Sequence, residues 1–166
     1  MSDDQIKEIL KNSKTIAMIG VSSEKKGEDP KNLKRKPANV VMKYMQDFGY
    51  KVYPINPFAV GEVINGEVVC ESLESINDKI DIVDVFRPSN ETPGIAKEAV
   101  NKKGKVLWLQ YGIENDEAEK IAKDADIQYL SNKCIKQEYQ RLFLKSNPVF
   151  PVLKDKLWKR YFLYMV

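Results

Sequence analysis

The stretch TIAMIGVSSEKKG, residues 15–27, sets the fold that the rest of the chain follows. It begins as an apolar strand and turns at Gly20 into a polar loop that carries two serines and two lysines. A strand that runs into a glycine turn is typical of the first strand–helix unit of a nucleotide-binding domain. The dinucleotide fingerprint requires three glycines in this turn, whereas Gly20 is followed here by Val21, Ser22 and Ser23. We therefore expect either a phosphate-binding loop of another kind or a plain turn.

Four later segments resemble this first strand in composition. They are rich in Val, Ile, Tyr and Trp, and most of them lack an alternation of polar and apolar residues. This is the pattern of strands that are covered on both faces, as in a parallel sheet. The five strands are expected at residues 15–20, 51–55, 80–86, 105–110 and 126–130.

The segments between the strands carry helix signals. The first has proline in its first turn, an apolar stripe and a glycine stop. The second opens with a Thr-Pro pair, and the third has an asparagine cap followed by acidic residues that favour the helix dipole. The helices are expected from Pro37 to the stop at Gly49, from Thr92 to Lys103 with Gly104 at its end, and from Asn115 through Asp124.

This alternation of strands and helices predicts an α/β fold, a doubly wound, Rossmann-like sheet of five parallel strands with helices on both faces. The Asn-Gly pair within EVINGEVV, residues 62–69, predicts a small hairpin after the second strand. We assign residues 1–145 to this domain and residues 146–166 to a C-terminal helical extension.

Composition excludes several classes of function. The chain contains no histidine, which removes Ser-His-Asp triads and histidine-based zinc sites. Its two cysteines have neither a disulfide framework nor metal-ligand spacing, so we expect no metal and a cytoplasmic location. The net charge of +3 is too small to indicate nucleic acid binding, and no apolar run approaches the ~20 residues of a membrane span. Without a convincing catalytic group, we expect a binding protein rather than an enzyme.

The charge is concentrated in one segment. EKKGEDPKNLKRK, residues 24–36, holds six basic and three acidic residues, and their difference of +3 equals the net charge of the whole chain. Such a segment is either a solvated surface loop or a patch that attracts an anionic ligand.

The residues that follow the strands are mostly small, amide, hydroxyl or turn-forming. In a doubly wound sheet a ligand binds outside the carboxyl ends of the strands, so these residues suit a polar, extended ligand. Each has an ordinary alternative: Asn56 and Pro57 form a simple turn, and Arg87 is a solvated loop arginine. Cys134 is interpreted more readily as a buried small hydrophobe than as a reactive thiol.

Five motifs in order carry a resemblance to a known family. IAMIGVSS, KPANVVMKYMQDFGYKVYPINP, IDIVDVFRPSN, VLWLQYGIEN and SNKCIK together resemble the small stand-alone CoA-binding proteins. Their Rossmann-like domain also forms the CoA-binding part of succinyl-CoA synthetase α subunits and of ADP-forming acyl-CoA synthetases. The resemblance covers residues 12–142 and implies coenzyme A or an acyl-CoA as the ligand, whose phosphates would suit the basic segment.

The resemblance also implies how individual residues are used. The loop after the first strand would hold the pyrophosphate, Asn56 and Pro57 would lie beside the adenosine ribose, and a basic residue of the 25–36 loop would lie near the 3′-phosphate. Residues after the third strand would line the nucleotide and pantetheine path, and those after the fourth would line the thiol end. The full set of candidates is Gly20, Val21, Ser22, Ser23, Lys26, Asn39, Asn56, Pro57, Phe86, Arg87, Pro88, Gln110, Tyr111, Gly112, Asn132 and Cys134.

Two other functions stay open. An NAD(P)-binding oxidoreductase or redox sensor would share the fold, but this chain lacks the fingerprint glycines and has Asn56 where an acidic residue normally holds the ribose. A CoA-binding component of a multi-chain acyl-CoA synthetase would need a partner chain to supply the histidine that carries phosphate in that family.

The tail after Leu142 is not part of the family pattern. Leu153, Leu157, Tyr161 and Met165 recur every four residues in it, which predicts a basic amphipathic helix. This helix packs on its own domain, forms a homodimer or partner contact, or lies on a membrane surface.

Overall fold

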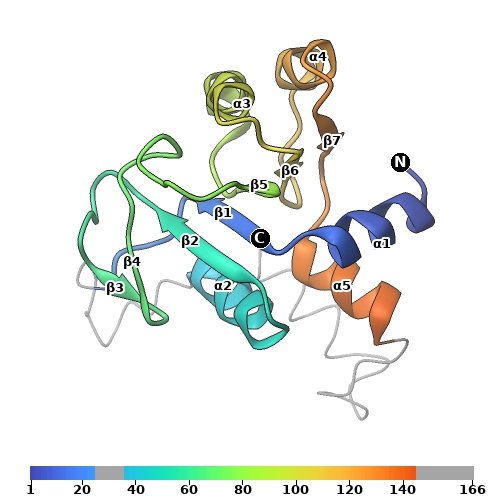
Figure 1. Cartoon of the computed structure of the whole chain (residues 1–166). Helices are drawn as coiled ribbons and strands as arrows, with labels where there is room; N and C mark the ends of the chain where they lie inside the picture. Colours follow the sequence, from blue (N-terminus) through green and yellow to red (C-terminus); the bar gives the residue numbers. More distant parts are fainter. Residues whose placement is uncertain (25–35, 145–166) are drawn as a thin grey trace.

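The computed structural model describes residues 1–24 and 36–144, and its centre is a parallel sheet between two layers of helices (Figure 1). The strand order is β2-β1-β5-β6-β7, so the chain moves outward from β1 in both directions. The predicted doubly wound, Rossmann-like α/β fold is thereby confirmed. The strands are β1 (Thr15–Ile19), β2 (Lys51–Ile55), β5 (Ile82–Val85), β6 (Val106–Leu109) and β7 (Gln128–Leu130).

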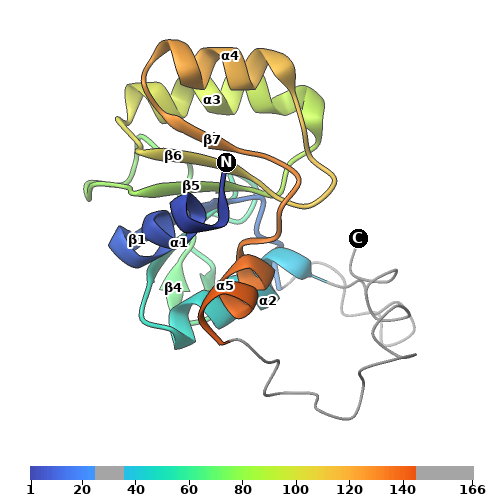
Figure 2. The ribbon, with the colours of Figure 1, turned by 90° about the vertical axis from the view of Figure 1, so that its right-hand side faces the viewer.

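The helices divide between the two faces of the sheet. Figure 2 shows α3 and α4 on one face and α1, α2 and α5 on the other. None of the helices in the described ranges is long and apolar enough to cross a membrane. The α-helices are α1 (Asp3–Asn12), α2 (Pro37–Asp47), α3 (Thr92–Asn101), α4 (Asp116–Asp124) and α5 (Ile135–Phe143), with a short 3₁₀ helix η1 (Ser89–Glu91) before α3.

Apolar residues on successive positions of each strand fill two separate cores. On β1, Ile16 and Met18 pack toward α2 and α5, whereas Ala17 between them packs toward α3 and α4. Every residue of β5 and β6 is buried. The strands lack an alternation of polar and apolar residues because both faces of the sheet are buried, as predicted.

The helix ends follow the sequence signals, with one correction. Pro37 occupies the first turn of α2, and the Asn115 side chain accepts a hydrogen bond from the Ala118 N–H at the start of α4. The prediction that α3 extends to Lys103 was wrong: it ends at Asn101, and Lys103 takes the left-handed conformation with φ 57°. Gly104 instead packs closely against β5, because a Cβ there would lie 3.2 Å from Val83 Cγ2.

The predicted hairpin is present as β3 (Val63–Ile64) and β4 (Glu67–Val68). Its turn has φ 48° at Asn65 and 82° at Gly66, the pair of positive values that an Asn-Gly hairpin turn requires. The Asn65 side chain also donates a hydrogen bond to the Asn39 carbonyl at 2.8 Å, which fastens the hairpin to α2.

A carboxyl group lies fully buried in the middle of the sheet. Asp84 of β5 is paired in register with Met18 of β1 and Trp108 of β6, and it is 0% exposed. Gln110 Nε2 donates to its Oδ1 at 2.6 Å, while Oδ2 has no hydrogen-bond partner within the described ranges. Burial raises the pKa of Asp84 to about 7, although the hydrogen bonds from Gln110 and the Val85 backbone act in the opposite direction.

The substitution Asp84→Asn is expected to change how stability varies with pH. The folded pKa lies above the usual 3.8, so the contribution of Asp84 to stability is complete below about pH 4 and is lost as the pH rises to about 7. The variant cannot ionise, and its free energy of unfolding should rise relative to the wild type by about 2 kcal/mol between pH 5 and pH 8. Urea denaturation of both proteins at the two pH values measures this change. An equal difference at both would contradict a raised pKa.

Candidate functional site

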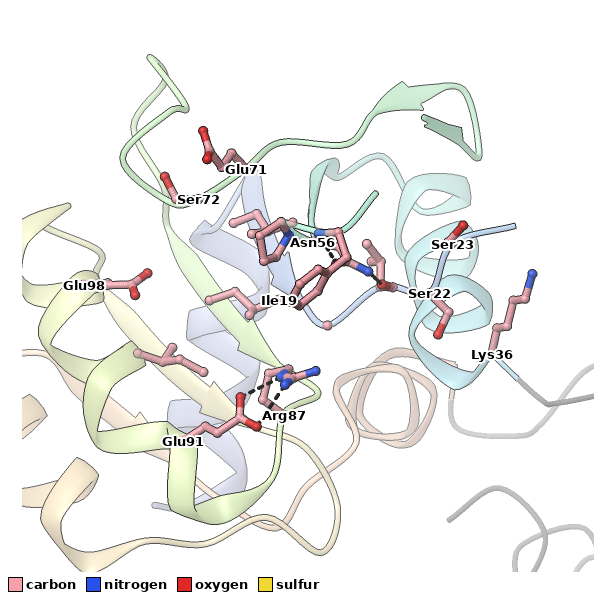
Figure 3. Close-up of a pocket in the computed structure, with 16 residues that line it drawn as sticks. Ile19, Ser22, Ser23, Lys36, Asn56, Glu71, Ser72, Arg87, Glu91 and Glu98 are labelled. Atoms are coloured by element: carbon pink, nitrogen blue, oxygen red, sulfur yellow. Dashed lines mark hydrogen bonds and ion pairs between the residues drawn. The ribbon is translucent and has the colours of Figure 1, made fainter. Parts of the chain in front are cut away.

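A cleft of about 670 Å³ opens at the carboxyl ends of β1, β2 and β5 (Figure 3). Because β1 lies between β2 and β5, this is the point at which the strand order reverses and where ligands of such sheets bind. Four parts of the chain line it: the loop after β1, the turn after β2, the segment after β4, and the loop and helix after β5. The lining residues are Ile19, Gly20, Val21, Ser22, Ser23, Lys36, Ile55, Asn56, Pro57, Phe58, Glu71, Ser72, Arg87, Glu91, Ile95 and Glu98.

The turn at Gly20 brings two strand ends into close contact. Gly20 has φ 98°, and a Cβ at this position would lie 2.9 Å from the Phe86 carbonyl oxygen and 3.2 Å from Arg87 Cδ. The Gly20 N–H donates to the Ile55 carbonyl at 3.1 Å, so the turn is also bonded to β2. Glycine is favoured at position 20 for two reasons: the backbone there has a positive φ, and the loop after β5 leaves no room for a Cβ.

Two asparagine side chains hold the loop after β1 in shape. Asn39 of α2 is buried, and its amide accepts from the Ser22 N–H and donates to the Ser22 carbonyl, both at 2.9 Å. Asn56 donates to the Val21 carbonyl at 2.8 Å and accepts from the Phe58 N–H at 2.9 Å. Both amides therefore act on the backbone of the cleft and fix its form.

These bonds narrow the set of groups that can meet an anion. The N–H groups of Gly20 and Ser22 are already donated within the protein. The Ser23 hydroxyl donates to the Glu62 carboxylate, with oxygen–oxygen distances of 2.8 and 2.9 Å. An anion in the cleft would consequently be bound more by side chains than by the backbone N–H groups of this loop. Lys36 and Arg87 supply the positive charge among the described lining residues.

Charge is distributed unevenly along the cleft. In Figure 3, Lys36 and Ser23 lie at one end, Glu71, Ser72 and Glu98 lie at the other, and Arg87 lies between them. Arg87 donates from Nε and Nη2 to the two carboxylate oxygens of Glu91 at 2.8 and 2.9 Å. An anionic group of a ligand is therefore favoured at the end that holds Lys36.

Apolar side chains form the walls between the two ends. Ile19 and Ile55 end their strands here, and Ile95 of α3 also lines the cleft. Phe58 also lines the cleft and is 80% exposed, which leaves the face of its ring accessible. Isolated aromatic rings of this kind suit stacking against a flat ligand group.

Seven of the predicted residues line the cleft together, and they come from three different strand ends. The Phe86 carbonyl abuts Gly20 and Pro88 precedes η1, so both adjoin the cleft without lining it. Asn39 supports the loop from behind. Lys26 lies outside the described residues. The seven are Gly20, Val21, Ser22, Ser23, Asn56, Pro57 and Arg87.

The predicted residues after β6 and β7 form a separate group. The Gly112 N–H donates to Asn132 Oδ1 at 2.8 Å, which joins the loops that follow the two strands. Gln110 is buried against Asp84, whereas Tyr111 is 48% exposed. Cys134 is buried at the start of α5, and burial raises the pKa of its thiol. The structure thus supports the interpretation of Cys134 as a buried small hydrophobe.

Comparison with known proteins decides the family. The sequence matches the CoA binding domain family over residues 14–140. The chain belongs to the CoA-binding domain family. It is 37% identical over 135 residues to the protein YneT of Bacillus subtilis (strain 168), a match that covers 81% of this chain and 92% of YneT.

Solved structures of similar proteins share the fold. A Thermus thermophilus protein is 35% identical, with a TM-score of 0.75, and the match covers 86% of this chain and 100% of that one. A dinucleotide-forming acetyl-coenzyme A synthetase of Ca. Korarchaeum cryptofilum is 22% identical, with a TM-score of 0.54, and the match covers 70% of this chain and 25% of that one. At this lower identity the likeness concerns the fold alone.

Several residues of this family member's cleft were not predicted from the sequence. The pairing of Glu91 with Arg87 could have been predicted from the sequence, because residues of opposite charge four positions apart meet on one side of a helical turn. Glu62 is 39 positions from Ser23 in the chain, and nothing local indicates that contact. The apolar wall residues look like ordinary strand and helix core residues, so their second role is visible only in three dimensions.

The substitution Gly20→Ala is expected to destabilise the protein by about 3 kcal/mol, because it combines an unfavourable backbone conformation with a clash against the Phe86 carbonyl. Gly49→Ala is a matched control: Gly49 has φ 93°, and a Cβ there would meet nothing within 4 Å. We expect the control to lose only about 1 kcal/mol. Urea denaturation of the two variants measures the difference, and equal losses would mean that the contact with Phe86 contributes nothing.

Proposed function

We propose that this protein binds coenzyme A or an acyl-CoA in the cleft at the ends of β1, β2 and β5, without chemistry of its own. One observation carries the proposal: in a chain of the CoA-binding domain family, the loop after β1, the turn after β2 and the loop after β5 converge on a single cleft. The cleft combines a positively charged end with apolar walls, and CoA combines phosphates with a nucleoside and a pantetheine arm.

The 3′-phosphate of CoA would lie at the end of the cleft that holds Lys36, and the pyrophosphate would lie between Lys36 and Arg87. Lys36 is the N-cap of α2, and no side chain within the described ranges caps this helix end. The N-terminus of a helix attracts anions through its N–H groups and its dipole. Ser23 and Lys36 both line the cleft, and in the sequence they flank the five basic residues Lys25, Lys26, Lys31, Lys34 and Arg35.

The remaining parts of CoA would follow the apolar walls. Pro57 and the exposed ring of Phe58 offer flat surfaces to the adenosine. The pantetheine arm would run past Arg87, and the thiol end would lie near Tyr111 and Gly112 after β6. The joined loops that contain Gly112 and Asn132 would then border the thioester of an acyl-CoA.

The form of the turn after β2 weighs against an NAD(P) enzyme. An acidic side chain normally holds the ribose hydroxyls of NAD at this position. Here the Asn56 amide is bonded at both ends to the backbone of Val21 and Phe58. It has no carboxylate to offer, and its two polar groups are already used to fix the cleft.

Two further expectations stay predictions. One is the division into a domain of residues 1–145 and a helical extension of residues 146–166, which lies outside the described residues. The other is a homodimer or partner contact through that extension. Native mass spectrometry of freshly purified protein would report a retained ligand and the number of subunits together.

Isothermal titration with CoA tests the proposed function. We expect CoA to bind and to raise the melting temperature, and NADH to do neither at the same concentration. Lys36→Ala should weaken CoA binding by about three- to tenfold through the loss of a charged contact. Lys43→Ala, on the same helix but paired with Asp47, should leave binding unchanged. Absence of CoA binding at millimolar concentration would refute the proposal, and stronger stabilisation by NADH would favour the oxidoreductase.

A further inference from the structure

Arg87 and Glu91 form an ion pair inside the cleft, between its cationic and acidic ends (Figure 3). The pair is bidentate: Nε and Nη2 of Arg87 each donate to one carboxylate oxygen of Glu91. Arg87 follows β5, and Glu91 is the last residue of η1, so both are placed by the loop that contacts Gly20.

The ion pair leaves part of the guanidinium available. A guanidinium group carries five N–H donors in one plane, and Glu91 receives two of them. Among the described residues, the two donors on Nη1 and one on Nη2 have no acceptor and can serve a ligand. Two parallel N–H groups on one edge of the plane fit a phosphate or a carboxylate.

Stability alone does not explain a carboxylate at this position. The side chains of Arg87 and Glu91 are 44% and 40% exposed, and an exposed pair of this spacing stabilises a protein little. At the same time, Glu91 adds a negative charge to a cleft whose proposed ligand is an anion. A negative charge near the ligand is compatible with tight binding if it serves to orient the neighbouring arginine.

We propose that Glu91 is a positioning residue, which holds the Arg87 guanidinium so that its remaining edge binds the pyrophosphate of CoA. The inference rests on the proposed function, because it assigns a role to one residue of the same cleft. Without Glu91, the long Arg87 side chain would have to be ordered when the ligand binds, and that ordering would reduce affinity. The stem of Arg87 lies beside the Gly20 turn, since a Cβ on Gly20 would come within 3.2 Å of Arg87 Cδ, and Glu91 bonds only the planar group.

Glu98 provides a matched control for the effect of charge. It lines the same cleft, lies on α3 seven residues after Glu91, and is not bonded to Arg87. Glu98→Gln removes one negative charge from the cleft and nothing else that concerns Arg87. Glu91→Gln removes the same charge and also releases the guanidinium.

The test is isothermal titration of CoA into the full chain and its variants. Glu98→Gln should bind CoA more tightly than the wild type, because repulsion decreases. Glu91→Gln should bind about three- to tenfold more weakly, because one rotamer-rich side chain must be ordered on binding. Melting temperatures without ligand should stay close to that of the wild type for both variants, since neither residue is buried.

A second pair of variants tests whether the loss of CoA affinity in Glu91→Gln depends on the arginine at position 87. Lysine presents a point charge without a planar fork, so its binding does not depend on orientation by Glu91. In an Arg87→Lys background, the added change Glu91→Gln should therefore not weaken CoA binding further. Tighter binding by Glu91→Gln alone, or an equal loss in both backgrounds, would overturn the inference. If the wild type fails to bind CoA, the proposed function itself is wrong, which is a different result.

Discussion

The contact between the Gly20 backbone and the Phe86 carbonyl is the constraint on which the cleft depends. The two residues follow neighbouring parallel strands, and no side chain fits between them because a Cβ on Gly20 would come within 2.9 Å of the carbonyl oxygen. This approach brings the loop after β1 beside Arg87 and leaves the space in front of both open as the cleft. The positive φ of Gly20 then turns the chain across the end of the sheet toward the segment that precedes α2.

Around this contact, amide side chains hold the neighbouring backbone segments in place. Asn39 forms hydrogen bonds with both the N–H and the carbonyl of Ser22. Asn56 joins the turns after β1 and β2, and Asn65 bonds the hairpin to α2. A loop that is held from outside by side chains can keep an ordinary sequence of Val and Ser. The cleft thus obtains a fixed form before any ligand is present, which reduces the ordering that binding requires.

The sequence was sufficient for the fold and for seven of the sixteen residues that line the cleft, and the reasons differ. The strands were predictable because residues such as Ile16, Ala17 and Met18 are buried in succession and leave no polar position. The cleft residues were predictable where a strand end coincides with a turn, as at Gly20 and Asn56. Contacts made across the fold, such as that of Ser23 with Glu62, depend on how distant segments meet and leave no local pattern. The helices α1 and α5 were also not predicted, since their apolar stripes are short and mutual packing defines them.

In the proposed CoA site, the hydrogen bond from Ser23 to Glu62 would make phosphate binding at Ser23 an exchange of acceptors. A serine hydroxyl has one proton to donate, and in this structure it is directed at a carboxylate that precedes the hairpin. A phosphate that accepted this proton would have to displace Glu62. The measured affinity would then reflect the difference in free energy between the two hydrogen bonds. Under that proposal the hairpin would enter the binding equilibrium through Glu62. Changes in the sequence of the hairpin would then alter the affinity of the cleft for CoA, and ligand binding would in turn alter the contacts of the hairpin.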